Sequence, residues 1–83
     1  MSIRIRLIGF GDDKPPGFDA TGCKTVELDT PASIEDLLKR AAIEPASDLI
    51  VMNTDSVIPR SDWRQCCVDN DAEITILSAI EGG

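Results

Sequence analysis

The chain has 83 residues and a mass of 8.9 kDa, which is the size of one small domain and excludes a multidomain enzyme. Eight Lys and Arg residues stand against fifteen Asp and Glu residues, and the net charge of -7 argues against nucleic acid as a partner. We therefore treat residues 1–83 as a single acidic domain. A core of this size leaves only about 3 to 5 kcal/mol of stability, which favours binding or carrying over catalysis.

The residue types that are missing narrow the chemistry. The sequence has no histidine, so it offers no Ser-His or Cys-His couple and no histidine ligand for a metal. The three cysteines, Cys23, Cys66 and Cys67, indicate a reducing compartment by their odd number and are too few for a simple iron-sulfur cluster. We expect no bound cofactor and no metal. Without a long apolar run or a signal-peptide pattern, we expect a cytoplasmic protein that makes no membrane contact.

The first half of the chain predicts a hairpin followed by a helix. Alternating apolar residues indicate strands at 3–8 and 24–29, which pair antiparallel. Between them, residues 9–23 are rich in glycine and proline and predict a long loop. Ser33 is expected to cap the helix and Pro45 to end it. The apolar face of this helix comprises Ile34, Leu37, Leu38, Ala41 and Ala42.

The second half predicts three more strands. Residues 49–52 and 57–58 form a second hairpin, and residues 73–77 alternate as the last strand. Residues 62–68 are expected to form a turn or a single 3₁₀ winding, and residues 69–71 a tight turn. These elements predict an α+β fold in which a mixed sheet packs one face on the single helix. This is the arrangement of a β-grasp, and the pattern also permits another α+β order.

Two glycines follow the last strand. Because Gly82 and Gly83 have no side chains, the backbone and its carboxylate can enter a channel too narrow for other residues. Attack of a carboxylate oxygen on the α-phosphate of ATP would give an acyl adenylate, from which a sulfur nucleophile displaces AMP. This chemistry needs no catalytic residue on the chain. We expect a flexible tail at residues 79–83, and the alternative is a frayed end with no role.

The C-terminal part of the sequence resembles a known family. The resemblance lies between residues 49 and 83, in the segments Ile50–Asn53, Val57–Arg60, Asp62–Trp63, Asp69–Asp71, Ile74–Ile76 and Gly82–Gly83. These segments are similar to the sulfur carriers of thiamine biosynthesis, which are ubiquitin-like proteins related to the small subunit of molybdopterin synthase. The resemblance implies a β-grasp with a flexible Gly-Gly tail, acting as a protein co-substrate and not as an enzyme.

The resemblance also implies the partners. An E1-like adenylating enzyme uses ATP to activate the Gly83 carboxylate, and a sulfur donor protein supplies the sulfur of the thiocarboxylate. Thiazole synthase then receives that sulfur. By this correspondence, Gly83 carries the sulfur and Gly82 keeps the approach open.

Two other functions stay open. The loop at residues 9–23 is longer than in a minimal thiamine-type carrier, and its length resembles the molybdopterin class. The first alternative is therefore a carrier that supplies sulfur to the large subunit of molybdopterin synthase or to another sulfur-containing metabolite. The second is a ubiquitin-like interaction module whose tail is never activated.

An exposed apolar patch beside the tail is expected to dock the activating enzyme. If residues 50, 52, 74 and 76 face the helix, alternation turns Val51 and Leu77 outward, near the point where Ile80 leaves the sheet. Val51, Leu77 and Ile80 are the predicted docking residues, and packing of the long loop over this edge is the alternative. The residues expected to face the helix are Ile50, Met52, Ile74 and Ile76.

The cysteines, the tryptophan and the paired carboxylates of the sequence are each expected to have a structural role. Cys66 and Cys67 are expected to pack as small buried hydrophobes, and Trp63 is expected to close the edge of the core. The carboxylates at Asp12–Asp13 and at Asp69–Asp71 lack the spacing of an EF-hand loop. We expect them to be solvated loop residues and not ligands of a divalent cation.

Overall fold

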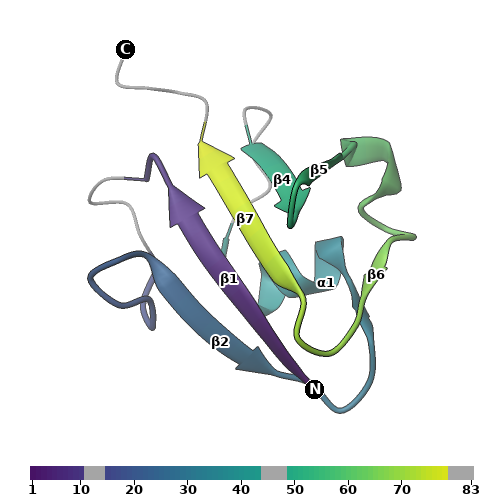
Figure 1. Cartoon of the computed structure of the whole chain (residues 1–83), viewed down its shortest axis with the longest axis horizontal. Helices are drawn as coiled ribbons and strands as arrows, with labels where there is room; N and C mark the ends of the chain where they lie inside the picture. The colour runs from purple at the N-terminus through teal and green to yellow at the C-terminus, as the bar shows by residue number, and fades with distance from the viewer. Residues whose placement is uncertain (11–14, 44–48, 79–83) are drawn as a thin grey trace.

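A computed structural model of the chain describes residues 1–10, 15–43 and 49–78 (Figure 1). The elements within these ranges, in chain order, are β1 (Ser2–Ile8), β2 (Cys23–Glu27), β3 (Ala32–Ser33), α1 (Ile34–Arg40), β4 (Leu49–Asn53), β5 (Ser56–Ile58), the 3₁₀ helix η2 (Arg60–Asp62), β6 (Cys67–Val68) and β7 (Glu73–Ser78). Over the same ranges, neither helix has the length and apolar character needed to cross a membrane.

Five strands form one mixed sheet in the order β2-β1-β7-β4-β5. The adjacent strands β1 and β7 run parallel, whereas the β1–β2, β4–β7 and β4–β5 pairs are antiparallel. In Figure 1, α1 lies behind this sheet, and no described helix covers the opposite face, here called the open face. The prediction of an α+β fold with a mixed sheet and one helix is confirmed. The arrangement is compatible with a β-grasp.

Alternation along β1 decides which side chains face α1. Ile3 and Ile5 are completely buried, whereas Arg4 and Arg6 between and after them are exposed. The same alternation operates in the other strands of the sheet, so one apolar layer forms between the sheet and α1. The largest fully buried side chains of the described residues are Ile3, Ile5, Ile34, Leu37, Ile74, Ile76, Val51 and Val68.

The helix begins where the sequence predicts and ends earlier. The Ser33 side chain accepts a hydrogen bond from the Asp36 backbone N–H at 3.1 Å, which confirms the N-cap. At the other end, Ala42 and Ile43 donate to the carbonyls of Lys39 and Leu38, the two bonds of a Schellman motif. Ala42 has a φ of 59° and is exposed, so its assignment to the apolar face is wrong. Pro45 lies outside the described residues.

The segment after β5 contains a strand that the sequence does not reveal. The 3₁₀ winding η2 begins at Arg60, two residues before the predicted segment, and a turn follows it at residues 63–65; Cys67 and Val68, predicted to belong to this turn, form β6 instead. This strand pairs antiparallel with Ala32–Ser33 of β3, so the entry to α1 is tied to the segment before β7. Two-residue strands are too short to show a period-2 pattern.

The turn before β7 is built from polar residues. Asp71 has a φ of 67° and donates its backbone N–H to the Ser2 carbonyl at 2.8 Å. The Asn70 side chain accepts from the Ser2 backbone N–H, also at 2.8 Å. Aspartate tolerates the left-handed region better than most residues, so the turn forms without glycine. The tight turn predicted at residues 69–71 is therefore confirmed.

Candidate functional site

A row of apolar side chains crosses the three central strands on the open face. Leu77 in β7 is the register partner of Ile8 in β1 and of Ile50 in β4. Ile8 is 44% exposed and Ile50 is 40% exposed, and Leu77 between them is half-buried. We call this surface the Ile8–Leu77–Ile50 row. Its residues come from the beginning, middle and end of the sequence, so only the fold brings them together.

The apolar surface continues onto the edge strand. Met52 follows Ile50 by two residues, which puts both side chains on the same face of β4. Met52 is half-buried and pairs in register with Val57 of β5, which is 60% exposed. The open face therefore has an apolar half, which extends from the end of β1 over β7, β4 and β5 and in which the row and the Met52–Val57 pair are contiguous.

Val51 does not belong to this surface. Its side chain is 0% exposed, and its register partners Ile76 and Ile58 are buried with it. The prediction that turns Val51 outward is wrong because β4 is shifted by one residue in phase, which exchanges its two faces. Ile50, expected to face the helix, instead occupies the open-face position assigned to Val51.

β7 is the strand that leads into residues 79–83. It is held between β1 and β4, and its inward side chains Ile74 and Ile76 are at most 1% exposed. Its last residue, Ser78, lies so close to Gly9 that a Cβ on this glycine would be 3.0 Å from the Ser78 carbonyl oxygen. The sheet therefore fixes the chain up to Ser78. Ile80, Gly82 and Gly83 lie outside the described residues, and their proposed roles stay predictions.

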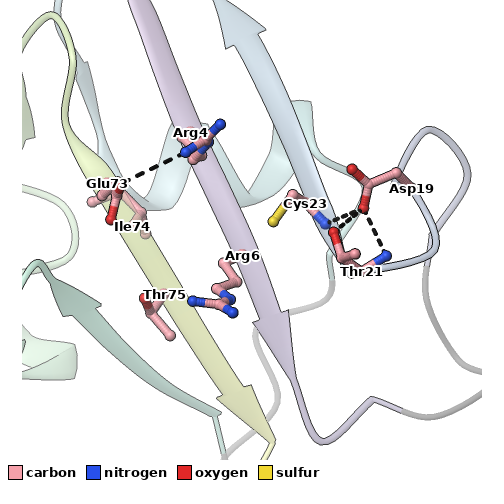
Figure 2. A pocket seen from close by; sticks show the side chains of 8 residues that line it. All are labelled: Arg4, Arg6, Asp19, Thr21, Cys23, Glu73, Ile74 and Thr75. Carbon is pink, nitrogen blue, oxygen red and sulfur yellow. Dashed lines mark hydrogen bonds and ion pairs between the residues drawn. The ribbon is translucent and has the colours of Figure 1, made fainter.

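A pocket of about 280 Å³ occupies the other half of the open face, over β2, β1 and β7 (Figure 2). Arg4 and Arg6 supply its cationic side chains. In the sheet register, Arg6 lies between Cys23 of β2 and Thr75 of β7. The remaining residues that line the pocket are Asp19, Thr21, Glu73 and Ile74. The sequence pattern does not reveal this pocket, because the pocket forms only when strands that are distant in sequence pair in the sheet.

The three cysteines are free and lie in different surroundings. Cys66 is half-buried and packs against the core, as predicted. Cys67 is exposed, so the prediction of burial is wrong for this residue. The cause is the alternation in β6, which turns Val68 into the core and its neighbour outward. Cys23 is half-buried at the start of β2 and lines the pocket.

Trp63 closes the edge of the core, as predicted. The indole is 4% exposed, and its Nε1–H donates to the Ile58 carbonyl at 3.1 Å. The Arg60 guanidinium carbon lies 4.3 Å from the ring centroid and covers the outer side of the indole. This tryptophan therefore joins β5 to η2 and has a structural role.

The described residues contain no cluster of three or more His, Cys, Asp or Glu side chains that could hold a metal ion. Asp69 and Asp71 are exposed and belong to the turn before β7. Asp12 and Asp13 lie outside the described ranges. No protein-family model and no curated protein matches the sequence.

Proposed function

We propose that the chain is a cytoplasmic sulfur carrier with a β-grasp fold, and that it supplies the sulfur for the thiazole ring of thiamine. The observation that carries this proposal is the position of β7. This strand lies at the centre of the sheet, presents Leu77 in the apolar row, and continues in sequence toward Gly82 and Gly83. An activating enzyme that covers the row would thus be docked beside the origin of the Gly-Gly segment.

The chemistry is carried by the backbone at the end of the segment. A carboxylate oxygen of Gly83 attacks the α-phosphate of ATP, the bond to pyrophosphate breaks, and an acyl adenylate forms. Hydrosulfide supplied by the donor protein then attacks the acyl carbon, AMP leaves with the electron pair of the broken C–O bond, and the sulfur loses its proton and stays on Gly83 as the thiocarboxylate. Gly82 contributes by having no side chain that could obstruct the narrow active site of the E1-like enzyme. The chain is a co-substrate in both steps.

The docking residue proposed on β4 is the one that the alternation of this strand turns toward the open face. Ile8, Ile50 and Leu77 are the apolar contacts for the activating enzyme, and Val51 is not among them. Ile80 remains a predicted contact from the sequence alone. Exposed apolar residues that are contiguous across several strands are typical of a protein interface.

Intact mass spectrometry tests the proposal. The chain ending at Gly83 is incubated with an E1-like enzyme, ATP and a sulfur donor protein, and the expected product has one terminal oxygen replaced by sulfur. The matched control is Gly82→Val, which keeps the carboxylate and follows β7 in sequence, so we expect the same fold and no thiocarboxylate. A thiocarboxylate on the Gly82→Val chain, or none on the parent chain with any thiamine-type or molybdopterin-type activating enzyme, would contradict the proposal.

The acceptor of the sulfur is decided in a second step. The thiocarboxylate form is given either thiazole synthase or the large subunit of molybdopterin synthase, and loss of the sulfur mass identifies the acceptor. The length of the loop at residues 9–23 is the feature that favours the molybdopterin alternative. A ubiquitin-like module without tail activation would form no adenylate and would keep its binding function after deletion of Gly82 and Gly83.

A further inference from the structure

The pocket in Figure 2 contains a cation that is available for a ligand. Within residues 1–10, 15–43 and 49–78, the Arg6 side chain makes no hydrogen bond or ion pair. Arg6 is exposed, and it lies in register between Cys23 and Thr75. A guanidinium in this position has all its N–H groups free to pair with an acceptor.

The two carboxylates of the pocket do not satisfy Arg6. Asp19 is engaged by its own loop, since its Oδ1 accepts from the Thr21 backbone N–H, the Thr21 hydroxyl and the Cys23 backbone N–H at 2.6 to 2.9 Å. Glu73 is 3.8 Å from the Arg4 guanidinium, and both side chains are 63% exposed. A long, solvated pair of this kind is weak and is readily exchanged for a better partner. The pocket therefore offers one free arginine and a second that is loosely held.

The pocket combines two cations, Arg4 and Arg6, with two carboxylates that are already engaged, Asp19 and Glu73. The net charge of -7 leads to the general expectation of a basic partner surface. Arg4 and Arg6, however, project from the same face as the apolar row, because Ile8 follows Arg6 by two residues in β1. A protein that covers the Ile8–Leu77–Ile50 row therefore lies beside Arg6, and a group that complements this unpaired cation is acidic.

We propose that the pocket binds a carboxylate side chain of a protein partner that docks on the open face. Arg6 receives the carboxylate in a forked pair of N–H donors, and Arg4 moves from Glu73 to share it. The hydroxyls of Thr21 and Thr75 line the same pocket and donate to the remaining oxygen lone pairs. The partner surface thus combines apolar side chains with an Asp or Glu. This inference goes beyond the sulfur-carrier function and does not depend on activation of the tail.

The pocket would recognise one carboxylate of the partner, so we expect a moderate effect on the affinity for the partner. A partly exposed ion pair at the rim of an interface contributes a factor of about three to five in affinity, and this contribution increases at low salt. Neighbouring apolar contacts supply the remaining affinity. A free small anion, which has no apolar part, would leave the row uncovered.

Chemical-shift mapping with two blocked peptides tests this proposal without any activating enzyme or ATP. The probes are Leu-Leu-Glu-Glu and Leu-Leu-Gln-Gln, acetylated and amidated, titrated into the ¹⁵N-labelled full chain at equal ionic strength. We expect the Glu peptide to shift the amides of Arg6, Thr21, Thr75 and Leu77 and to bind about three-fold more tightly than the Gln peptide. Equal binding of the two peptides, or no shift at the pocket amides, overturns the proposal.

Two variants and one competitor complete the test. Arg6→Gln is expected to abolish the preference for the Glu peptide, whereas Arg40→Gln, at the end of α1 and exposed, is expected to keep it. Retention of the preference in Arg6→Gln overturns the proposal. Inorganic phosphate is titrated separately, and saturation of the same amides by phosphate but not by the Glu peptide would show a small-anion site instead. An unchanged thermal transition in both variants excludes unfolding as the cause.

Discussion

Ile50 and Leu77 lie directly opposite each other in the antiparallel β4–β7 pair, with both side chains on the open face of the sheet. The two residues are far apart in sequence, and each contributes apolar surface that the other extends. Cross-strand neighbours of this kind act as one contact area when a partner covers them. The pair therefore marks the centre of the surface that a docked protein would use.

Leu77→Asp is expected to reduce activation while leaving the fold intact. A charge at the centre of an apolar contact costs on the order of 2 kcal/mol of binding, so the apparent affinity for the activating enzyme should fall about thirty-fold. Leu77 is half-buried on the open face and outside the α1-facing layer, so the free energy of unfolding should change by less than about 1 kcal/mol. Adenylation kinetics and urea denaturation check the two expectations. Unchanged kinetics with an unchanged fold would remove the docking surface from the proposal.

The same substitution at two adjacent residues of β4 is expected to lower the free energy of unfolding by very different amounts. Val51→Asp places a carboxylate where the side chain is 0% exposed, and the cost exceeds about 3 kcal/mol, comparable with the whole stability of so small a domain. Ile50→Asp replaces a side chain that is 40% exposed and should cost less than about 1 kcal/mol. Far-UV circular dichroism and urea denaturation separate a folded from an unfolded variant. If both variants fold equally well, the observed phase of β4 is wrong.

The phase of a strand is predictable only where a polar residue marks one face. In β7, Thr75 interrupts an apolar run, and the sequence assigns Ile74 and Ile76 correctly to the core. In β4, residues 49–52 are all apolar, so both phases bury the same number of apolar residues. Asn53 gives no help, since it shares a face with the buried Val51. The docking residue on β4 could therefore not be identified before the pairing was known.

Local signals predicted the beginning of the helix and missed its end. Ser33 is a strong capping residue, and its hydrogen bond to the Asp36 N–H is present. The end depends on Ala42 adopting a left-handed conformation, for which alanine gives no sequence signal. Pairing of β3 with β6 was missed for a related reason: contacts between two-residue strands are decided by the tertiary fold. The pocket around Arg6 likewise depends on three strands that only the sheet brings together.

Gly22→Ala is expected to destabilise the chain more than Gly17→Ala. Both glycines have positive φ angles, 85° and 97°, so alanine is strained at each by about 1 to 2 kcal/mol. At Gly22, the added Cβ would also lie 2.8 Å from the Leu7 backbone carbonyl oxygen, which cannot move without disturbing β1. At Gly17, the nearest atom is the mobile Lys24 Nζ at 3.0 Å. Urea denaturation should show at least about 1 kcal/mol between the variants, and equal losses would contradict this account.

Trp63→Phe is expected to lower the free energy of unfolding by about 2 to 4 kcal/mol. The substitution removes the Nε1–H that donates to the Ile58 carbonyl at 3.1 Å and leaves a void where the indole is 4% exposed. Arg60→Gln is the control, since it removes the cation over the ring and keeps the indole; its loss should be only about 1 kcal/mol. Urea denaturation followed by far-UV circular dichroism measures both, because the phenylalanine variant has no tryptophan fluorescence. Equal losses would mean that the indole is held by Arg60 and not by its burial against β5.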